Sequence, residues 1–524
     1  MDGPGKAKYT EGVKDVKAGE AASSTRSSGG GCGSCLKRMV GFIPLEYRRE
    51  LVQVFKLAGP LMIFMISFIS TVFCGHLGKT ELAGVSLSIA VVNVTGISIG
   101  TGLSLTCDTL ISQTYGSGNL KRVGVILQRG ILILLLACFP CWAILINTEP
   151  LLLAVRQSTE VARLTQLYVK IFMPALPAAF MYQLEGRYLQ NQGIIWPQVV
   201  TGAIGNICNA VINYIFLFRL DMGVAGSAAA NAISQYFLAV ILYVYICWRG
   251  LHKATWGGWT MECLQEWGPF VKLAIPSMLM LCLEWWTFEM GGFLAGMISE
   301  AELGAQSIAY ELTVVAYMFP LGFSAAASVR VGNALGAGNI EQAKLSSKVP
   351  IICTCKDQCI QYMFPETPFF FLLWLSNGVL RGAGKQMIGA ACNLVGHYII
   401  GFPISVALMF AAHMGVVGLW IGLTISVFMQ SIFFVIYVCR LNWKKVTEEV
   451  CTYIPLKQNV TICLETDAYQ EVQISDQNVP TTTTVGDVLS VKQLVVRRGL
   501  ALLIMILILV VGIFANHFLV RLFD

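Results

Sequence analysis

Residues 277–296 read SMLMLCLEWWTFEMGGFLAG, and residues 304–323 read GAQSIAYELTVVAYMFPLGF. Each run is long enough for an α-helix to cross a hydrocarbon layer of about 30 Å. Yet the first run contains Glu284 and Glu289, and the second contains Glu311. A charged side chain near the centre of a bilayer costs at least about 2.5–3.5 kcal/mol, so it usually faces a polar cavity and handles a cation or a proton. These two runs therefore predict membrane helices that take part in transport.

The composition agrees with a membrane protein. The chain has 524 residues, of which 56% are hydrophobic and only 13% are charged, and its mean hydropathy is +0.67. Apolar runs of about 20 residues recur along the chain, which predicts an all-α polytopic membrane protein, whereas a β-barrel would show alternating runs of about ten residues. The net charge of +6 lies in loops and flanks. There it sets membrane topology and gives no sign of nucleic-acid binding.

Twelve spans are expected. Their approximate ranges are 57–75, 83–107, 123–147, 166–189, 195–218, 222–247, 270–298, 303–327, 363–382, 386–411, 415–439 and 500–520. Basic residues are concentrated in alternate loops, which the positive-inside rule places in the cytoplasm.

The two halves of the chain resemble each other. Four short matches occur in the same order and include polar, glycine and proline positions: Lys56–Pro60 with Lys272–Pro276, Gln113–Asn119 with Asn333–Asn339, Cys208–Asn209 with Cys392–Asn393, and Met222–Gly226 with Met414–Gly418. Such a repeat predicts two six-helix lobes related by an axis along the membrane normal, with a binding cavity between them.

The second half is shorter than the first. Gly116 and Asn209 are 93 positions apart, whereas the matching Gly336 and Asn393 are only 57 apart. The deficit of 36 residues would account for about one helix and its loop. Residues 349–376 are therefore expected to be irregular, with Lys356 and Asp357 where a span should run.

These observations predict five parts of the chain. They are a disordered cytoplasmic N-terminal tail (1–50), an N-lobe of six spans (51–250), a C-lobe of five to six spans (251–440), a cytoplasmic linker (441–499) and an extra C-terminal span (500–524).

The sequence gives no sign of a cofactor, a metal or an enzymatic site. The 17 cysteines are mostly scattered singly through apolar runs, and the pair Cys32 and Cys35 has no second pair at a spacing typical of zinc sites. Nucleotide-binding Walker strings and nucleophile–base arrangements are also missing from the sequence.

Several strings in the chain resemble the multidrug and toxin extrusion (MATE) family, in its vertebrate branch. They are VFCGHLGK, CDTLISQTYGSGN, IPSMLML followed by EWW, LGAQSIAYE, SVRVGNALGAG and GVLRGAGKQ, and the resemblance extends from about residue 50 to 445. It implies two six-helix lobes that exchange an organic cation for a proton and export drugs and toxins. It further implies a monomeric transport unit in the plasma membrane, on the apical side of epithelia.

The resemblance also implies roles for individual residues. Glu284, Glu289 and Glu311 match glutamates that bind cations and protons. The residues that match the family's substrate cavity are Trp285, Tyr310, Tyr317 and Asn93, and those that match thiol-sensitive positions are Cys74 and Cys138. One departure is Phe370, which stands where the family has a further glutamate.

The chemistry suggested by these residues is a competition. A carboxylate held away from water can bind either a proton or a soft organic cation, and aromatic rings can hold the cation by contacts of about 0.5–2 kcal/mol. Glu284 and Glu289 are five positions apart, about 140° around a helix, so they would need a bend, for which Pro276 is a candidate, to face one point.

Other interpretations of the same residues stay open. A glutamate in a span can be the structural partner of a lysine or arginine, and aromatic residues in a span can serve packing. The short second half suggests a different function, that of a transport-deficient isoform that regulates an intact relative or is inactive.

Overall fold

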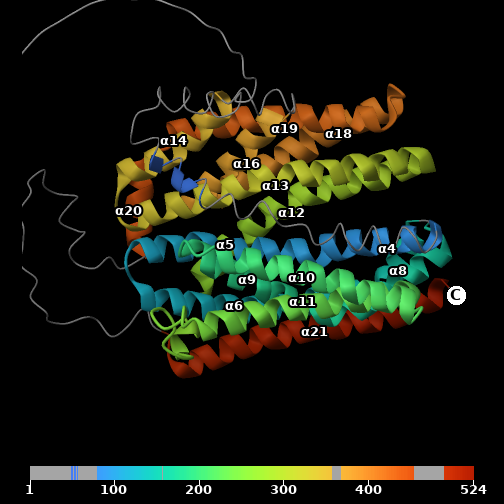
Figure 1. Cartoon of the computed structure of the whole chain (residues 1–524), viewed down its shortest axis with the longest axis horizontal. Coiled ribbons are helices and arrows are strands. Elements are labelled where there is room, and N and C mark those ends of the chain that lie inside the picture. The colour runs from blue at the N-terminus through green and yellow to red at the C-terminus, as the bar shows by residue number, and fades with distance from the viewer. Residues whose placement is uncertain are drawn as a thin grey trace, which may run out of the picture. The chain divides into compact units, whose positions relative to one another are not determined.

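The computed structural model describes residues 49–50, 52–54, 56, 79–155, 157–356, 367–453 and 489–523, and the regular elements in these ranges are all helices (Figure 1). Ten of the described helical segments are long and apolar enough to cross a membrane. They correspond to ten of the twelve predicted spans. The predicted first span, 57–75, lies outside the described residues, and the described part of the predicted span at 363–382 is a shorter apolar helix, Phe369–Gly382.

The N-lobe contains five described spans. α4 (Lys79–Val92), η1 (Asn93–Ile97) and α5 (Ser98–Gly116) form one of them, and α6 (Leu120–Leu145) is the next. After α7 (Thr148–Ala154), the chain returns through α8 (Thr159–Phe172), η2 (Met173–Ala175) and α9 (Leu176–Asn191). The last two spans are α10 (Trp196–Tyr214) with η3 (Ile215–Arg219), and α11 (Gly223–Trp248).

The C-lobe follows the short helix η4 (Met261–Leu264). Its two long helices are α12 (Trp267–Ile298) and α13 (Glu300–Gly336), followed by α14 (Ile340–Lys356) and α16 (Thr367–Gly382). The next span is built from α17 (Gln386–Asn393), η5 (Leu394–Gly401), α18 (Phe402–Val406) and η6 (Ala407–Ala411). The chain continues through α19 (Gly415–Arg440), α20 (Trp443–Tyr453) and α21 (Val491–Phe523).

The basic loops gather at one end of the helices, which we call the basic end. It holds the turns after α5, α11, α13, α16 and α19, and the start of α21, and it carries, among others, Lys121, Arg249, Lys344, Lys385 and Lys444. The other end, with the turns after α6, η3, α12 and η6, is called the opposite end.

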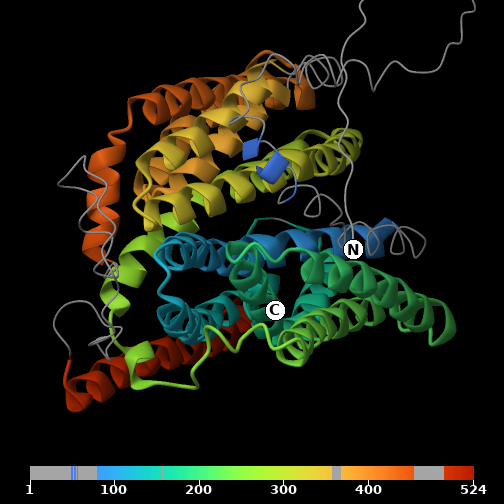
Figure 2. The same cartoon turned by 60° about the vertical axis from the view of Figure 1, so that its left-hand side comes forward.

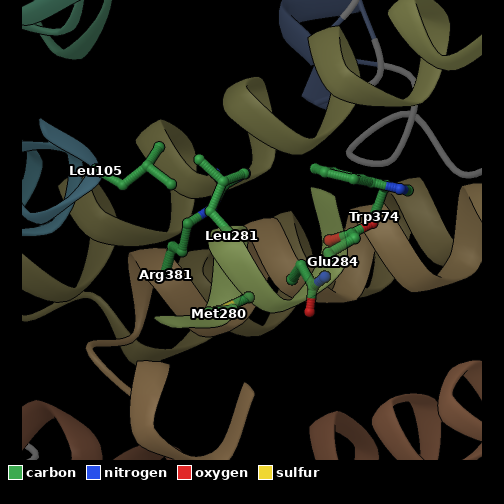
Figure 3. Close-up of a pocket in the computed structure, with 7 residues that line it drawn as sticks. Leu105, Met280, Leu281, Glu284, Trp374 and Arg381 are labelled. Carbon is green, nitrogen blue, oxygen red and sulfur yellow. The ribbon is translucent and has the colours of Figure 1, made fainter. Parts of the chain in front are cut away.

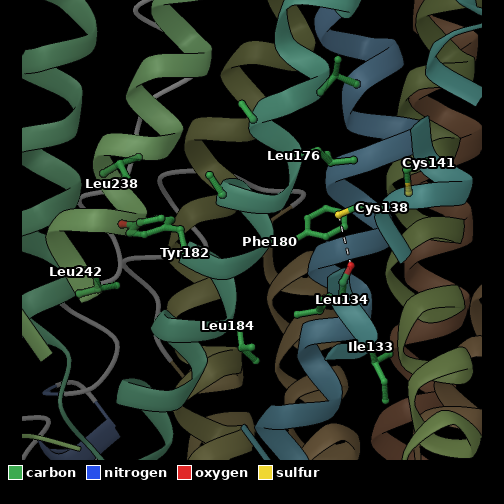
Figure 4. Close-up of a cluster of buried hydrophobic side chains, with 14 of the residues drawn as sticks. Ile133, Leu134, Cys138, Cys141, Leu176, Phe180, Tyr182, Leu184, Leu238 and Leu242 are labelled. Carbon is green, nitrogen blue, oxygen red and sulfur yellow. Dashed lines mark hydrogen bonds between the residues drawn. The ribbon is translucent and has the colours of Figure 1, made fainter. Parts of the chain in front are cut away.

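The N-lobe has a continuous apolar core. Phe180 and Leu176 of α9 pack among Leu134 and Cys138 of α6, and all four side chains are buried (Figure 4). Close approach to α5 depends on Gly100, because a Cβ at this position would lie 2.0 Å from the Phe180 ring. Burial of a side chain of this size contributes about 1.5–3 kcal/mol, so this core fixes α5, α6 and α9 as one unit.

The two lobes meet through reciprocal contacts at the basic end. A Cβ on Gly116 of α5 would lie 2.1 Å from the carbonyl oxygen of Asn333, and one on Gly336 of α13 would lie 1.8 Å from the carbonyl oxygen of Gln113. The sequence repeat pairs Gly116 with Gly336 and Gln113 with Asn333. The repeat therefore places each glycine against the backbone of the other lobe, as an approximate twofold axis requires. We call this contact the seam.

Glycines with positive φ agree with two of the sequence matches and add a third pair to the alignment of the two halves. Gly118, Gly193 and Gly223 have φ of 77°, 78° and 55°, and each follows a helix end or begins a helix. Their counterparts Gly338, Gly384 and Gly415 have φ of 72°, 72° and 57°. Left-handed backbone is favourable only for glycine at such turns.

This alignment corrects one predicted match. Gly193 pairs with Gly384, an offset of 191 positions, whereas the match of Cys208–Asn209 with Cys392–Asn393 has an offset of 184. The predicted match was wrong by about two helical turns, because short apolar strings align easily with one another. On the corrected alignment, Gly118 to Gly193 is 75 positions, Gly338 to Gly384 is 46, and the deficit is 29 residues.

The deficit is shared between two helices. α14 has 17 residues where its counterpart α6 has 26, and α16 has 16 where α8, η2 and α9 together cover 33. Both short helices keep the half next to the basic end, and α14 lies at the same end as α20 in Figure 1. At about 1.5 Å per residue, each is about 25 Å long or less.

The chain therefore begins α14 and ends α16 at the basic end. This arrangement keeps Lys385 on the side where the basic loops gather, which the predicted loss of one whole helix would not do. The region expected to be irregular, 349–376, is helical to Lys356 and again from Thr367, and residues 357–366 lie outside the described ranges.

The extra C-terminal span packs on the N-lobe. On α21, the carbonyl oxygen of Gly512 accepts a hydrogen bond from Asn147 Nδ2 at 2.9 Å, and Asn516 donates to the carbonyl of Ile146 at 2.9 Å. At the basic end, the Arg498 guanidinium lies 4.3 Å from the centre of the Trp267 ring. α21 runs alongside α6 (Figure 1).

Candidate functional site

Glu284 lies in a small cavity where both lobes meet. The cavity is lined by Leu105 of α5, by Met280, Leu281 and Glu284 of α12, and by Trp374, Asn377 and Arg381 of α16 (Figure 3). Glu284 is only 2% exposed. The cavity has room for about one water molecule, so an organic cation does not fit beside the carboxylate in this conformation.

A buried arginine shares this cavity with Glu284. Arg381, at 3% exposure, donates a hydrogen bond from Nη2 to Ser324 Oγ at 2.7 Å. Its charge is close enough to Glu284 for the two to interact, but within the described residues Arg381 forms no ion pair of 4 Å or less. The alternative interpretation, that a glutamate in a span is the partner of an arginine, therefore applies to Glu284, although the two side chains are farther apart than in a salt bridge.

Aromatic side chains pack around the same cavity. Tyr317 of α13 contacts Trp374 edge-on, with ring centroids 4.4 Å apart. Trp285 and Tyr317 pack against the cluster of Leu105, Leu281 and Trp374. Two of the predicted cavity aromatics are thus placed next to Glu284.

Glu289 belongs to a separate group of side chains. Tyr310 donates a hydrogen bond from its hydroxyl to Glu289 Oε1 at 3.4 Å, and its ring centroid is 6.3 Å from that of Phe288. Phe288 in turn contacts Trp420 of α19. Since α12 continues as a helix through Pro276, the two glutamates remain about 7.5 Å apart along its axis and point about 140° apart. The bend considered from the sequence does not bring them together.

The other predicted site residues are distributed more widely. Glu311 lies on α13. Asn93 begins η1 in the N-lobe and is half-buried, next to the point where Trp286 of α12 donates to the carbonyl of Val94 at 3.0 Å. Cys138 is buried in the α6 core, where its Sγ lies 3.5 Å from the Leu134 carbonyl oxygen (Figure 4), and Cys74 lies outside the described residues.

Sequence reasoning missed several charged groups inside the spans, among them Arg381 and Asp108. Arg381 lies at the end of the predicted span 363–382 and was not considered as a site residue. Asp108, 1% exposed on α5, pairs with Arg187 at 3.3 Å and accepts a hydrogen bond from Asn191 at 3.0 Å. Both residues stand in or beside apolar runs, so the rule that selected the three glutamates would have selected them too.

Metal chemistry has no support in the described part of the chain. Within these ranges, no three His, Cys, Asp or Glu side chains are grouped to hold a metal ion.

Comparison with known proteins places the chain in a family. The MatE family model matches residues 58–215 and 276–356, one segment in each half, and the second match ends where α14 ends. Multidrug and toxin extrusion protein 1 of Danio rerio is 59% identical, with 95% of each chain covered, and that of Homo sapiens is 50% identical, with 90% of this chain and 94% of the human protein covered. The chain belongs to the MATE family.

Solved structures agree with the fold. The eukaryotic MATE transporter AtDTX14 is 27% identical and superposes with a TM-score of 0.71 over 77% of this chain and 99% of its own. An outward-facing multidrug resistance MATE family transporter superposes with a TM-score of 0.63 at 17% identity, which shows the shared fold. This MATE chain is thus a multi-pass membrane transporter with two helical lobes, and not an enzyme. The predicted fold class is confirmed.

Proposed function

We propose that this protein is a proton-coupled antiporter that exports organic cations, including drugs and toxins, across the plasma membrane. The names of its relatives support extrusion of drugs and toxins as the activity. The observation that carries the cation and proton part is Glu284, a carboxylate buried at the junction of the two lobes with Trp285 and Tyr317 beside it.

Glu284 is the residue best placed for exchange. It reaches a cavity lined by α12, α16 and α5, so separating the lobes would expose it to water on one side of the membrane or the other. A proton and an organic cation would each neutralise its charge, and a site that small cannot hold both. Glu289, with Tyr310 and Phe288, would supply a second contact for a larger cation, and we assign Glu311 and Asn93 to the same pathway.

Transport into proteoliposomes tests this function. Purified protein is reconstituted, a pH step is imposed with the lumen acidic, and uptake of radiolabelled tetraethylammonium is measured. We expect uptake that requires the pH step and is lost in Glu284→Gln. Glu262→Gln is a matched control, because Glu262 lies in the η4 loop, away from the cavity. Two results would contradict the proposal: uptake that is the same with and without the pH step, or pH-dependent uptake in Glu284→Gln that equals that of the unaltered protein.

A second candidate function is favoured by the shortened hairpin. Within the described residues, α14 and α16 are not long and apolar enough to count as spans. The alignment with the Danio rerio protein covers 563 positions against 524 residues, so at least 39 of them have no residue here. A chain with this defect would serve as a transport-deficient partner of an intact relative. Co-expression with the intact relative tests it: a lower flux or altered location of that relative supports this role, and unchanged flux and location exclude it.

A further inference from the structure

Arg381 contacts both the carboxylate cavity and the seam. Its guanidinium lines the Glu284 cavity, while its own carbonyl oxygen accepts a hydrogen bond from Thr109 Oγ1 of the N-lobe at 2.7 Å. The next carbonyl, that of Gly382, accepts from Gln113 Nε2 of the same lobe at 2.9 Å. One turn of α16 thus carries a buried charge on its side chain and the inter-lobe hydrogen bonds on its backbone.

The backbone of this turn cannot shift freely against α13. A Cβ on Gly378 would lie 2.2 Å from the Ser324 carbonyl oxygen, and one on Gly382 would lie 2.6 Å from that of Ser328. Such close packing makes α16 and α13 a rigid pair. When the lobes separate at the basic end, Arg381 must therefore stay with the C-lobe, whereas Thr109 and Gln113 leave with α5.

Two acids in different lobes are near enough to act on the Arg381 guanidinium, and one of them, Asp108, is also paired with Arg187 at 3.3 Å. The charged and titratable groups that act on Arg381 are Asp108 of α5, Glu284 of α12, Arg187 of α9 and Tyr317 of α13. Asp108 is one residue from Thr109, so it moves with the N-lobe. Arg381 Nε is buried and has no hydrogen-bond partner among the described residues, which leaves it available to a carboxylate.

We propose that Arg381 is a positioning residue that makes proton binding at Glu284 depend on whether the seam is closed. With the seam closed, Asp108 shares the positive charge, and Glu284 retains its proton more readily. With the seam open, Asp108 withdraws and Arg381 is left to Glu284. By Coulomb's law, the ionised carboxylate is then favoured, the proton leaves, and an organic cation can take its place.

This inference rests on the proposed function and deepens it, because antiport requires that proton binding differ between the two sides. A fixed cation near the carboxylate would favour ionisation equally in both conformations. An arginine that also interacts with an acid of the other lobe stabilises the ionised Glu284 to a different degree as the lobes move, while its own charge stays the same.

Binding of tetraethylammonium to purified protein, measured as a function of pH, tests the inference without requiring transport. In Arg381→Gln, we expect the pH midpoint of binding to rise by about one unit, a tenfold change in proton affinity equal to about 1.4 kcal/mol. Arg381→Lys keeps the charge and should shift the midpoint less. In Asp108→Asn, the midpoint should fall, because Arg381 is then left to Glu284.

The double variant separates this route from direct repulsion between the two acids. If Asp108 acts through Arg381, then Asp108→Asn has no further effect in the Arg381→Gln background, whereas direct repulsion would persist there. Should either variant fail to fold, Thr109→Val provides the test. It removes both hydrogen bonds of Thr109 Oγ1 to the C-lobe, the one donated to the Arg381 carbonyl and the one accepted from Gln386 Nε2, without changing a residue that lines the cavity, and it should lower the midpoint. An unchanged midpoint in Thr109→Val, or in Arg381→Gln where that variant folds, would overturn the inference.

Different results would refute the proposed antiport function and the proposed role of Arg381. If Glu284→Gln leaves the pH dependence of binding intact, the proposed function itself is wrong. If Glu284→Gln abolishes the pH dependence but the Arg381 and Asp108 variants bind with the unaltered midpoint, then only the role of Arg381 is refuted.

Discussion

Replacing Gly116 and Gly336 with alanine should open the seam. The new methyl groups would lie 2.1 Å and 1.8 Å from carbonyl oxygens of the other lobe. Ordinary contacts begin at 3.4 Å, so the backbones would have to separate by more than 1 Å at each point. Overpacking of this kind costs about 1–3 kcal/mol, and here the cost falls only on the conformation in which the seam is closed.

The conformational equilibrium should shift accordingly. A penalty of about 1–3 kcal/mol lowers the ratio of closed to open molecules by about 5- to 150-fold for each variant. In the double variant, the free-energy penalty on the closed conformation should be smaller than the sum of the two single penalties, because either substitution alone already separates the same pair of helices.

Hydrogen exchange read by mass spectrometry measures this change without labels. Peptides covering residues 109–118 and 331–338 should exchange faster in Gly116→Ala and in Gly336→Ala than in the unaltered protein. Gly268→Ala is the matched control, because it lies on α12 near the basic end, where an added methyl group would have nothing within 4 Å. Equal exchange in the seam variants and the control would refute the reasoning.

Three further predictions concern other parts of the chain. Burial alone would raise the pKa of Glu50, but hydrogen bonds from Arg330, Ser346 and Gln342 and the Arg330 charge together hold this pKa below its usual value. The ionised Glu50 carboxylate therefore stabilises the fold above about pH 4.5, and this stabilisation is lost as the pH falls through the lowered pKa. Glu50→Gln should reduce the melting temperature at pH 7, and the difference in melting temperature between the variant and the unaltered protein should become smaller in acid. Asn516→Leu should cost about 1 kcal/mol by removing the hydrogen bond between α21 and Ile146, measured by thermal unfolding in detergent. Epitope tags placed after Asn339 and after Lys385 should be accessible from the same side of the membrane in selectively permeabilised cells, and opposite sides would exclude the paired shortening of α14 and α16.

Much of the fold could be predicted because the decisive signals are local. A span is defined by about 20 consecutive apolar residues, and basic loops report its orientation. The repeat could be read for the same reason, since Gly116 and Gly336 follow similar strings. The alignment just after α9 could not, because the match of Cys208–Asn209 with Cys392–Asn393 is too short to fix it and the positive φ of Gly193 and Gly384 is a property of the backbone.

The site was only partly predictable. Glu284 lines the cavity, and Trp285 and Tyr317 pack against the neighbouring cluster of Leu105, Leu281 and Trp374, since residues on adjacent helices of one lobe come together once the spans are known. Arg381 could not be placed, because its role depends on α16 packing against α13 through Gly378 and on the hydrogen bond from Thr109, both far away in sequence. Contacts between lobes are invisible to any analysis of one span at a time.

The way the second half is shortened explains why the cavity survives. Loss of a single helix would reverse the direction of every later span and move Arg381 away from Glu284. Loss of residues from the adjoining halves of two antiparallel helices keeps the direction of α17 to α19. It also keeps the C-terminal part of α16, with Trp374, Asn377 and Arg381, in place. What the shortening removes lies toward the opposite end, beyond the cavity. The carboxylate, its arginine and the seam therefore form a unit that the chain retains, and the binding experiments on Glu284 and Arg381 address it whether or not the protein completes a transport cycle.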